Sequence, residues 1–198
     1  MDKLSKKVVA QLCTSGVIQE DDREVYEYSL NILLIGVFHT LTVLLIGFVF
    51  GMFIESIVLF ASFFLARKFA GGFHMPKHWQ CYLFTIATVS GALFLARVLL
   101  MQSDIIYYAV IGVSAAVIFV LAPIGHPNKP LSLKEMKVYR LISWALCVLL
   151  TGLSLVFFHW FSRSIGLGIG MGIVLCAFAL ALAAVEKRLK KVRSNMKD

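Results

Sequence analysis

The residues best suited to chemistry lie in one short segment that contains a cysteine and two histidines. Cys81 is preceded by His78 three residues earlier and by His74 seven residues earlier. A thiol beside an imidazole can attack acyl groups, because the histidine takes the thiol proton and later protonates the leaving group. The segment therefore predicts nucleophilic cysteine chemistry.

The spacing alone leaves both histidines as candidates for the base. On a continuous helix His78 lies almost directly above Cys81, whereas His74 lies two turns away, at about 10 Å for a rise of ~1.5 Å per residue. The glycine pair at 71–72, however, permits unusual backbone conformations, and Pro76 keeps the preceding residue out of the helical region. A chain reversal there would return His74 to the sulfur.

Cys81 is expected in the first turn of a helix. Pro76 suits an early helical position, where its missing N–H is not needed. The free N–H groups of a helix N-terminus favour a thiolate. The competing interpretation is a small buried side chain, as we expect for Cys147 and Cys176. The four cysteines are widely separated and predict neither a disulfide nor a metal framework.

The elements that must position this segment are membrane helices. The 198 residues are 60% hydrophobic, and long uncharged stretches recur between Asn31 and Val185. A helix needs roughly 20 apolar residues to cross a bilayer core of about 30 Å. The sequence predicts an all-α polytopic membrane protein with six transmembrane helices, at 31–50, 53–69, 80–101, 105–122, 139–160 and 164–185.

The basic residues are distributed unevenly about these spans. With a cytoplasmic N-terminus, every lysine and arginine except Arg97 and Arg163 falls in a cytoplasmic segment or at its edge, as the positive-inside rule requires. Both termini and the loop that carries the Cys-His segment are then cytoplasmic. Any substrate would come from inside the cell.

Three regions are expected along the chain. Residues 1–30 form a cytoplasmic or interfacial segment with a short amphipathic helix, because lysines and apolar residues alternate there. Residues 31–185 form the six-span membrane catalytic domain, and residues 186–198 form a basic cytoplasmic tail. In the last span, small-xxx-small spacing permits close helix packing, within the chain or across a homodimer; the residues are Gly166, Gly168, Gly170 and Gly172.

Several residues around Cys81 form a longer motif. They are Arg67, Gly71, Gly72, His74 and Cys81, followed by Pro123 and by Pro127-Asn128-Lys129-Pro130. This motif, the chain length, the multiple spans and the basic tail resemble the accessory gene regulator B (AgrB) family of bacterial membrane peptidases. The resemblance implies that His74 and Cys81 are the catalytic pair, and it gives His78 no catalytic role.

The resemblance also implies a substrate, an AgrD-like quorum-sensing precursor peptide with an acidic C-terminal tail. Cys81 would form a thioester with the precursor as the tail leaves, and an internal cysteine or serine would then close a thiolactone or lactone ring. Substrate contacts are expected from Arg67, Lys68, Gly71, Gly72 and Lys129. We expect a bacterial cell membrane location, and no cofactor, metal or nucleic acid.

Two other functions compete with this hypothesis. A metal-dependent membrane hydrolase could use His74, His78 and Cys81, whose i, i+4, i+7 spacing aims three ligands at one zinc ion on an unbroken helix. Pro76 disfavours such a helix. A non-enzymatic peptide transporter is the other alternative, but the spans hold few ionisable groups and no paired broken helices.

Overall fold

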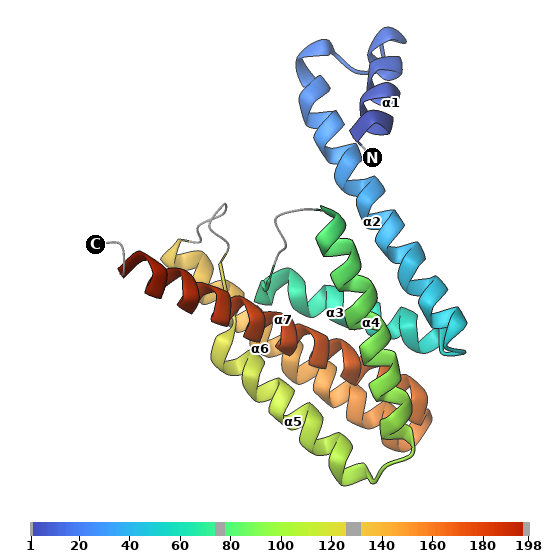
Figure 1. Cartoon of the computed structure of the whole chain (residues 1–198), viewed down its shortest axis with the longest axis vertical. Coiled ribbons are helices and arrows are strands. Elements are labelled where there is room, and N and C mark those ends of the chain that lie inside the picture. The colour runs from blue at the N-terminus through green and yellow to red at the C-terminus, as the bar shows by residue number, and fades with distance from the viewer. Residues whose placement is uncertain (1, 74–77, 126–131, 196–198) are drawn as a thin grey trace. The chain divides into compact units, whose positions relative to one another are not determined.

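The computed structural model describes residues 2–73, 78–125 and 132–195, and most of these are helical (Figure 1). Seven α-helices lie within these ranges, which confirms the predicted all-α class. The only strand-like pairing among the described residues is an isolated bridge between Gly71 and Ile124. The chain divides into two compact units, Met1–Thr42 and Val43–Asp198.

The first unit contains the predicted amphipathic helix, α1 (Asp2–Thr14), a 3₁₀ turn η1 (Glu20–Asp22) and the beginning of α2 (Arg23–Val49). Val9 and Ser5 are buried, whereas the α1 lysines are exposed. The helix thus separates an apolar from a basic face. Arg23 pairs with Glu20 at 2.6 Å and with Glu27 at 2.9 Å, and α2 begins there, before the predicted boundary at residue 31.

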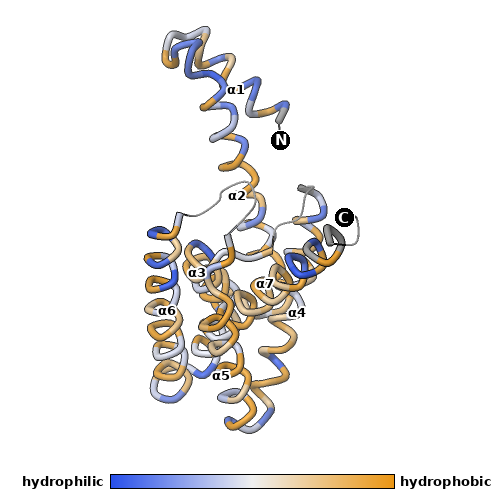
Figure 2. Tube along the Cα trace, turned by 90° about the vertical axis from the view of Figure 1, so that its left-hand side faces the viewer, coloured by the Kyte–Doolittle hydropathy of each residue, from blue (hydrophilic) through white to orange (hydrophobic). Residues whose placement is uncertain are grey.

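The second unit contains α3 (Phe53–Ala70), α4 (His78–Leu100), α5 (Asp104–Leu121), α6 (Leu133–Val156) with a π-helical extension η2 (Phe157–Phe161), and α7 (Arg163–Asn195). Helices α2, α4, α5, α6 and α7 are each long and apolar enough to cross a membrane. Helix α3 spans 18 residues and carries Glu55 in its first turn and Arg67 and Lys68 in its last, so charged residues shorten its apolar stretch. Figure 2 shows hydrophobic residues over most of α5, and hydrophilic ones on α1 and at the start of α6.

Two further helices, like α2, extend beyond the apolar stretches predicted as spans. Helix α6 begins at Leu133 because Ser132 and Glu135 form a capping box, in which each side chain accepts from the other's backbone N–H. Helix α7 continues to Asn195, with a Glu186–Lys190 pair in its polar part. Hydropathy marks only the membrane segment of a helix, so these polar extensions were missed.

Helix α7 forms the centre of the second unit and packs against α3, α4, α5 and α6. Its glycines allow this close packing. A Cβ on Gly172 would lie 2.8 Å from the Phe63 nitrogen and 2.9 Å from the Leu59 carbonyl oxygen of α3, whereas one on Gly170 would meet Ile111 of α5 at 2.7 Å. The chain's own helices therefore cover the glycine series, and the homodimer stays a prediction.

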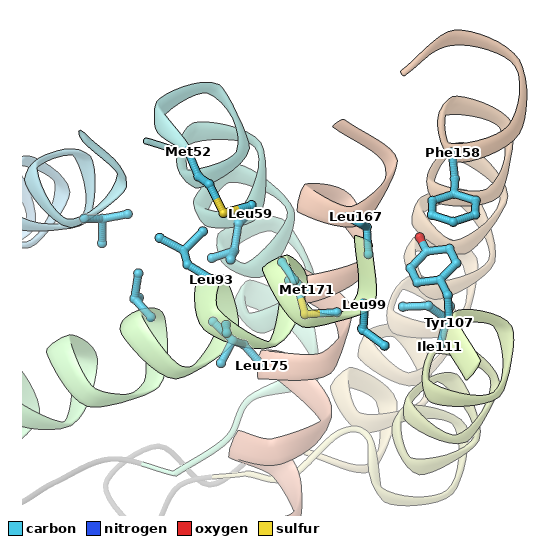
Figure 3. Packing of buried hydrophobic residues seen from close by; sticks show 14 residues of the cluster. Met52, Leu59, Leu93, Leu99, Tyr107, Ile111, Phe158, Leu167, Met171 and Leu175 are labelled. Atoms are coloured by element: carbon cyan, nitrogen blue, oxygen red, sulfur yellow. The ribbon is translucent and has the colours of Figure 1, made fainter. Parts of the chain in front are cut away.

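The side chains around α7 form a continuous apolar core (Figure 3). Leu167, Met171 and Leu175 project from α7 toward residues of α3, α4 and α5, including Leu59 and Leu93. A second cluster joins Ala66 and Ala70 of α3 to residues of α5, α6 and α7, and on α7 it continues to Leu180, in the later part of the helix. This later part of α7 brings the core to the loop that precedes Cys81.

Candidate functional site

Cys81 lies in the first turn of α4, as the sequence predicts. Its side chain is half-buried, and its carbonyl oxygen accepts a hydrogen bond from Thr85 Oγ1 at 3.0 Å. The local sequence permits the helix to start here because Pro76 precedes it. The thiol is thus at a helix N-terminus without being sealed in the core.

The other three cysteines differ from Cys81 in their surroundings. Cys147 and Cys176 are buried in the core of the same unit, as predicted. Cys13 belongs to the first unit, where desolvation and then the Glu20 carboxylate raise the pKa of its thiol. All four are free thiols. Cys81 is therefore the thiol of the second unit that a substrate can reach.

The loop that leads from α3 toward Cys81 is held by close backbone contacts. Gly71 and Gly72 have φ values of 77° and 140°, which disfavour residues with a side chain. Ile124 N donates to Ala70 O at 3.0 Å, and a Cβ on Gly71 would collide with the Ile124 carbonyl oxygen. The predicted glycine turn therefore lies directly against the segment that follows α5.

Phe73 connects this loop to three helices. Its N–H donates to the Ala179 carbonyl of α7 at 3.1 Å, and its carbonyl accepts from the Arg67 guanidinium of α3. Its ring meets Phe84 of α4 edge-on at 5.9 Å, and Phe84 in turn stacks on Phe178 of α7 at 6.3 Å. Phe84 is three residues after Cys81, so this aromatic cluster adjoins the face of α4 that carries the thiol.

Arg67 is half-buried beside this loop. Its guanidinium lies over the Phe63 ring at 5.5 Å and donates to the Phe73 carbonyl. No carboxylate forms an ion pair with it within the described part of the chain. Lys68, by contrast, is exposed, with its ammonium 5.6 Å from the Phe69 ring centre.

Two predicted site residues, His74 and Lys129, lie outside the described residues, so their pairing with Cys81 and with substrate stays a prediction. His78 is the first residue of α4. Among the described residues no three histidine, cysteine or acidic side chains gather closely enough to hold a metal ion. The alternative zinc set includes His74, so that hypothesis is untested.

Sequence reasoning missed three features of this region. These are the hydrogen bond from Phe73 to Ala179, the contact between Arg67 and the Phe73 carbonyl, and Gln80. The Gln80 Oε1 is buried beside Cys81 without a hydrogen-bond partner among the described residues. A glycine pair signals a close backbone approach in a sequence, but it does not identify the partner.

Comparison with known proteins adds one finding. The family model AgrB, Accessory gene regulator B, matches residues 2–180. Comparison with curated proteins gives no significant match, and comparison with solved structures gives none either. The match runs from α1 to Leu180, near the middle of α7, and includes the loop from Arg67 to Cys81.

Proposed function

Because the chain belongs to the accessory gene regulator B family and thus takes part in quorum-sensing peptide processing, we propose that it acts as a membrane cysteine endopeptidase and cyclase. One observation carries the proposal. Cys81 is half-buried in the first turn of α4, whereas the other cysteines of its unit are buried. The proposed substrate is an AgrD-like precursor with an acidic tail.

The first step is acyl transfer to Cys81. His74 takes the thiol proton, and the sulfur attacks the carbonyl carbon of the scissile peptide bond. The C–N bond then breaks, and His74 returns the proton to the leaving amine of the tail. The products are the free tail and a thioester between Cys81 and the remaining precursor.

The second step releases the ring. A cysteine or serine within the precursor attacks the thioester carbonyl, its proton passes to the Cys81 sulfur through His74, and a thiolactone or lactone forms. Hydrolysis would lose the acyl energy of the thioester, so the site must exclude water. The aromatic cluster of Phe73, Phe84 and Phe178 supplies an apolar wall for this purpose.

Basic residues around the loop suit the acidic tail. Lys68 is exposed at the end of α3, beside Gly71, and Lys129 follows α5 in the sequence. Their charges would attract an acidic peptide and raise its association rate. The substrate contacts that the sequence predicts for Arg67, Gly71 and Gly72 stay predictions.

The apolar helices identify a membrane protein, and we propose the bacterial cell membrane with both termini and the Cys81 loop in the cytoplasm. Labelling single cysteines with an impermeant maleimide tests this orientation in intact cells. A cysteine at Ser103 or Ser162 should react from outside, whereas one at Ser132 should react only after lysis. The opposite pattern would reject the proposed topology.

Trapping the thioester tests the proposed chemistry. A precursor whose internal cysteine or serine is replaced by alanine cannot close the ring, so the acyl-enzyme should accumulate in proteoliposomes. Mass spectrometry should find the added mass on the peptide that contains Cys81, and hydroxylamine should remove it. Tail release that proceeds at the parental rate in Cys81→Ser would contradict the proposal.

The same assay separates the metal-dependent alternative. The cysteine mechanism predicts that a chelator leaves tail release unchanged. Loss of activity with a chelator and its return with zinc would favour a metal hydrolase, because catalytic zinc is required for water activation.

A further inference from the structure

Both backbone polar groups of Phe73 are held by other parts of the unit. The N–H donates to the Ala179 carbonyl of α7 at 3.1 Å, and the carbonyl accepts from the Arg67 guanidinium of α3. Loop residues rarely have both groups held by tertiary contacts, since most lie at the surface and bond to water. Phe73 immediately precedes His74 in the chain. The backbone that enters the histidine segment is thus fixed by α3 and α7.

Groups on several sides of the Arg67 guanidinium hold it in this contact. The Phe63 ring lies on one face, at 5.5 Å from the guanidinium carbon. Gly72 approaches it so closely that a Cβ there would lie 2.8 Å from Nη1. The side chain is half-buried, whereas its neighbour Lys68 is exposed. A planar guanidinium fits a slot between a ring and a glycine, and a lysine ammonium does not.

We infer that Arg67 is a positioning residue for the reaction at Cys81. It donates to the Phe73 carbonyl, while the Ala179 carbonyl accepts from the Phe73 N–H, and so it helps to fix the backbone of the residue that precedes His74. This role differs from the substrate contact expected from the sequence. The inference rests on the proposed function, because it assumes that His74 and Cys81 react together.

The first test compares Arg67→Lys with a matched control, Arg97→Lys. Arg97 also donates to a backbone carbonyl, that of Phe50 at 3.5 Å, but lies in the last turn of α4. With saturating precursor in proteoliposomes, Arg67→Lys should lower kcat for tail release roughly 10²-fold, the loss typical of a small displacement of reacting groups. KM should stay within about two-fold of the parent, since substrate binding is retained. Arg97→Lys should match the parent.

A precursor with a neutralised tail, in which Asp and Glu are replaced by Asn and Gln, separates positioning from tail binding. A positioning role predicts the same fold loss in Arg67→Lys for both precursors, because the two changes are independent. A raised KM with an unchanged kcat, or a loss that disappears with the neutral tail, would show a substrate contact and overturn the inference.

A second variant reaches the same contact from the opposite side. Gly72→Ala places a methyl group against Arg67 and should reproduce the kcat loss, whereas Gly91→Ala in α4, which meets open space, should not. Gly72→Ala tests the same contact if the Arg67→Lys protein does not fold.

The Cys81→Ser variant distinguishes a failure of the proposed function from a failure of the positioning role of Arg67 alone. If Cys81→Ser is inactive while Arg67→Lys and Gly72→Ala both keep the parental kcat, only the positioning role is wrong. If Cys81→Ser keeps parental activity, the proposed function fails and the positioning role fails with it.

Discussion

The two ends of the second unit hold their polar groups in different ways. The far end lies around Tyr107, Ser154, Phe158, Arg163 and Asp104, and the loop end lies around Arg67, Phe73 and Cys81. At the far end, side chains satisfy each other. The Tyr107 and Ser154 hydroxyls share a hydrogen bond, and Tyr107 OH also lies 3.1 Å from the Gly166 carbonyl oxygen. Tyr107 stacks on Phe158 at 4.1 Å (Figure 3).

Charges at the far end are also paired. Arg163 forms an ion pair with Asp104 and lies over Phe158 at 4.8 Å, and Glu55 accepts from Ser164. At the loop end Arg67 has no acidic partner among the described residues. The Gln80 amide oxygen, in the first turn of α4, is buried there without a hydrogen-bond partner among the described residues. A network in which each polar group has a hydrogen-bond partner stabilises a fold. A polar group without a partner in the protein is available to bind a ligand. This contrast agrees with our proposal that the far end is structural and the loop end is reactive.

Removal of the thiol should produce the largest effect. We expect Cys81→Ala to reduce tail release by at least about 10⁴-fold, because loss of a covalent nucleophile leaves only binding and orientation. Cys147→Ala, in the core of the same unit, should retain release within about ten-fold, since it costs packing rather than chemistry. Similar losses in the two variants, at matched folded amounts, would break the distinction between reactive and structural cysteines.

Removal of the base should have the next largest effect. His74→Ala should slow tail release roughly 10²–10⁴-fold, the range for loss of a general acid-base group. His78→Ala is its matched control. It should slow tail release by less than about ten-fold, because His78 takes no part in proton transfer in the proposed mechanism and affects only the orientation of the reacting groups. A larger loss in His78→Ala than in His74→Ala would assign the base to the residue that begins α4.

A glycine-to-alanine substitution at each end of the second unit should affect stability and activity differently. Gly172→Ala pushes a methyl group against the α3 backbone and should destabilise the fold by about 1–3 kcal/mol, as overpacking does. Gly71→Ala, with its positive φ and its contact with Ile124, should lower activity more than it lowers stability. Thermal unfolding and tail release of each variant, with Gly152→Ala as an open-space control, would measure the two effects.

The smallest effect is expected from a single hydroxyl at the far end. Tyr107→Phe should cost about 0.5–1.5 kcal/mol of stability, because Ser154 still donates to the Gly166 carbonyl at 2.8 Å. Tail release should be unchanged. Tyr108→Phe, whose side chain is exposed, should be neutral in the same unfolding assay. A loss of activity in Tyr107→Phe without a loss of stability would mean that the far end also takes part in function.

Several features could be predicted because their causes are local in the chain. Apolar stretches of membrane length predicted the helices, and the residues before Cys81 predicted its place in a first turn. The capping box at Ser132 and Glu135 was equally local, yet it was overlooked because hydropathy alone defined the start of that span. A cap marks where a helix begins, whereas hydropathy marks where it enters the membrane.

By itself, the sequence of this protein determined the helical membrane class, the amphipathic first helix and the single thiol that begins a helix after a glycine turn. Only the tertiary structure decided what the glycines and Arg67 contact. Gly172 meets Leu59 of α3, and Phe73 donates to Ala179 of α7. Periodicity and composition report on neighbours within a helix, but these partners are more than a hundred residues apart, so helix packing alone brings them together.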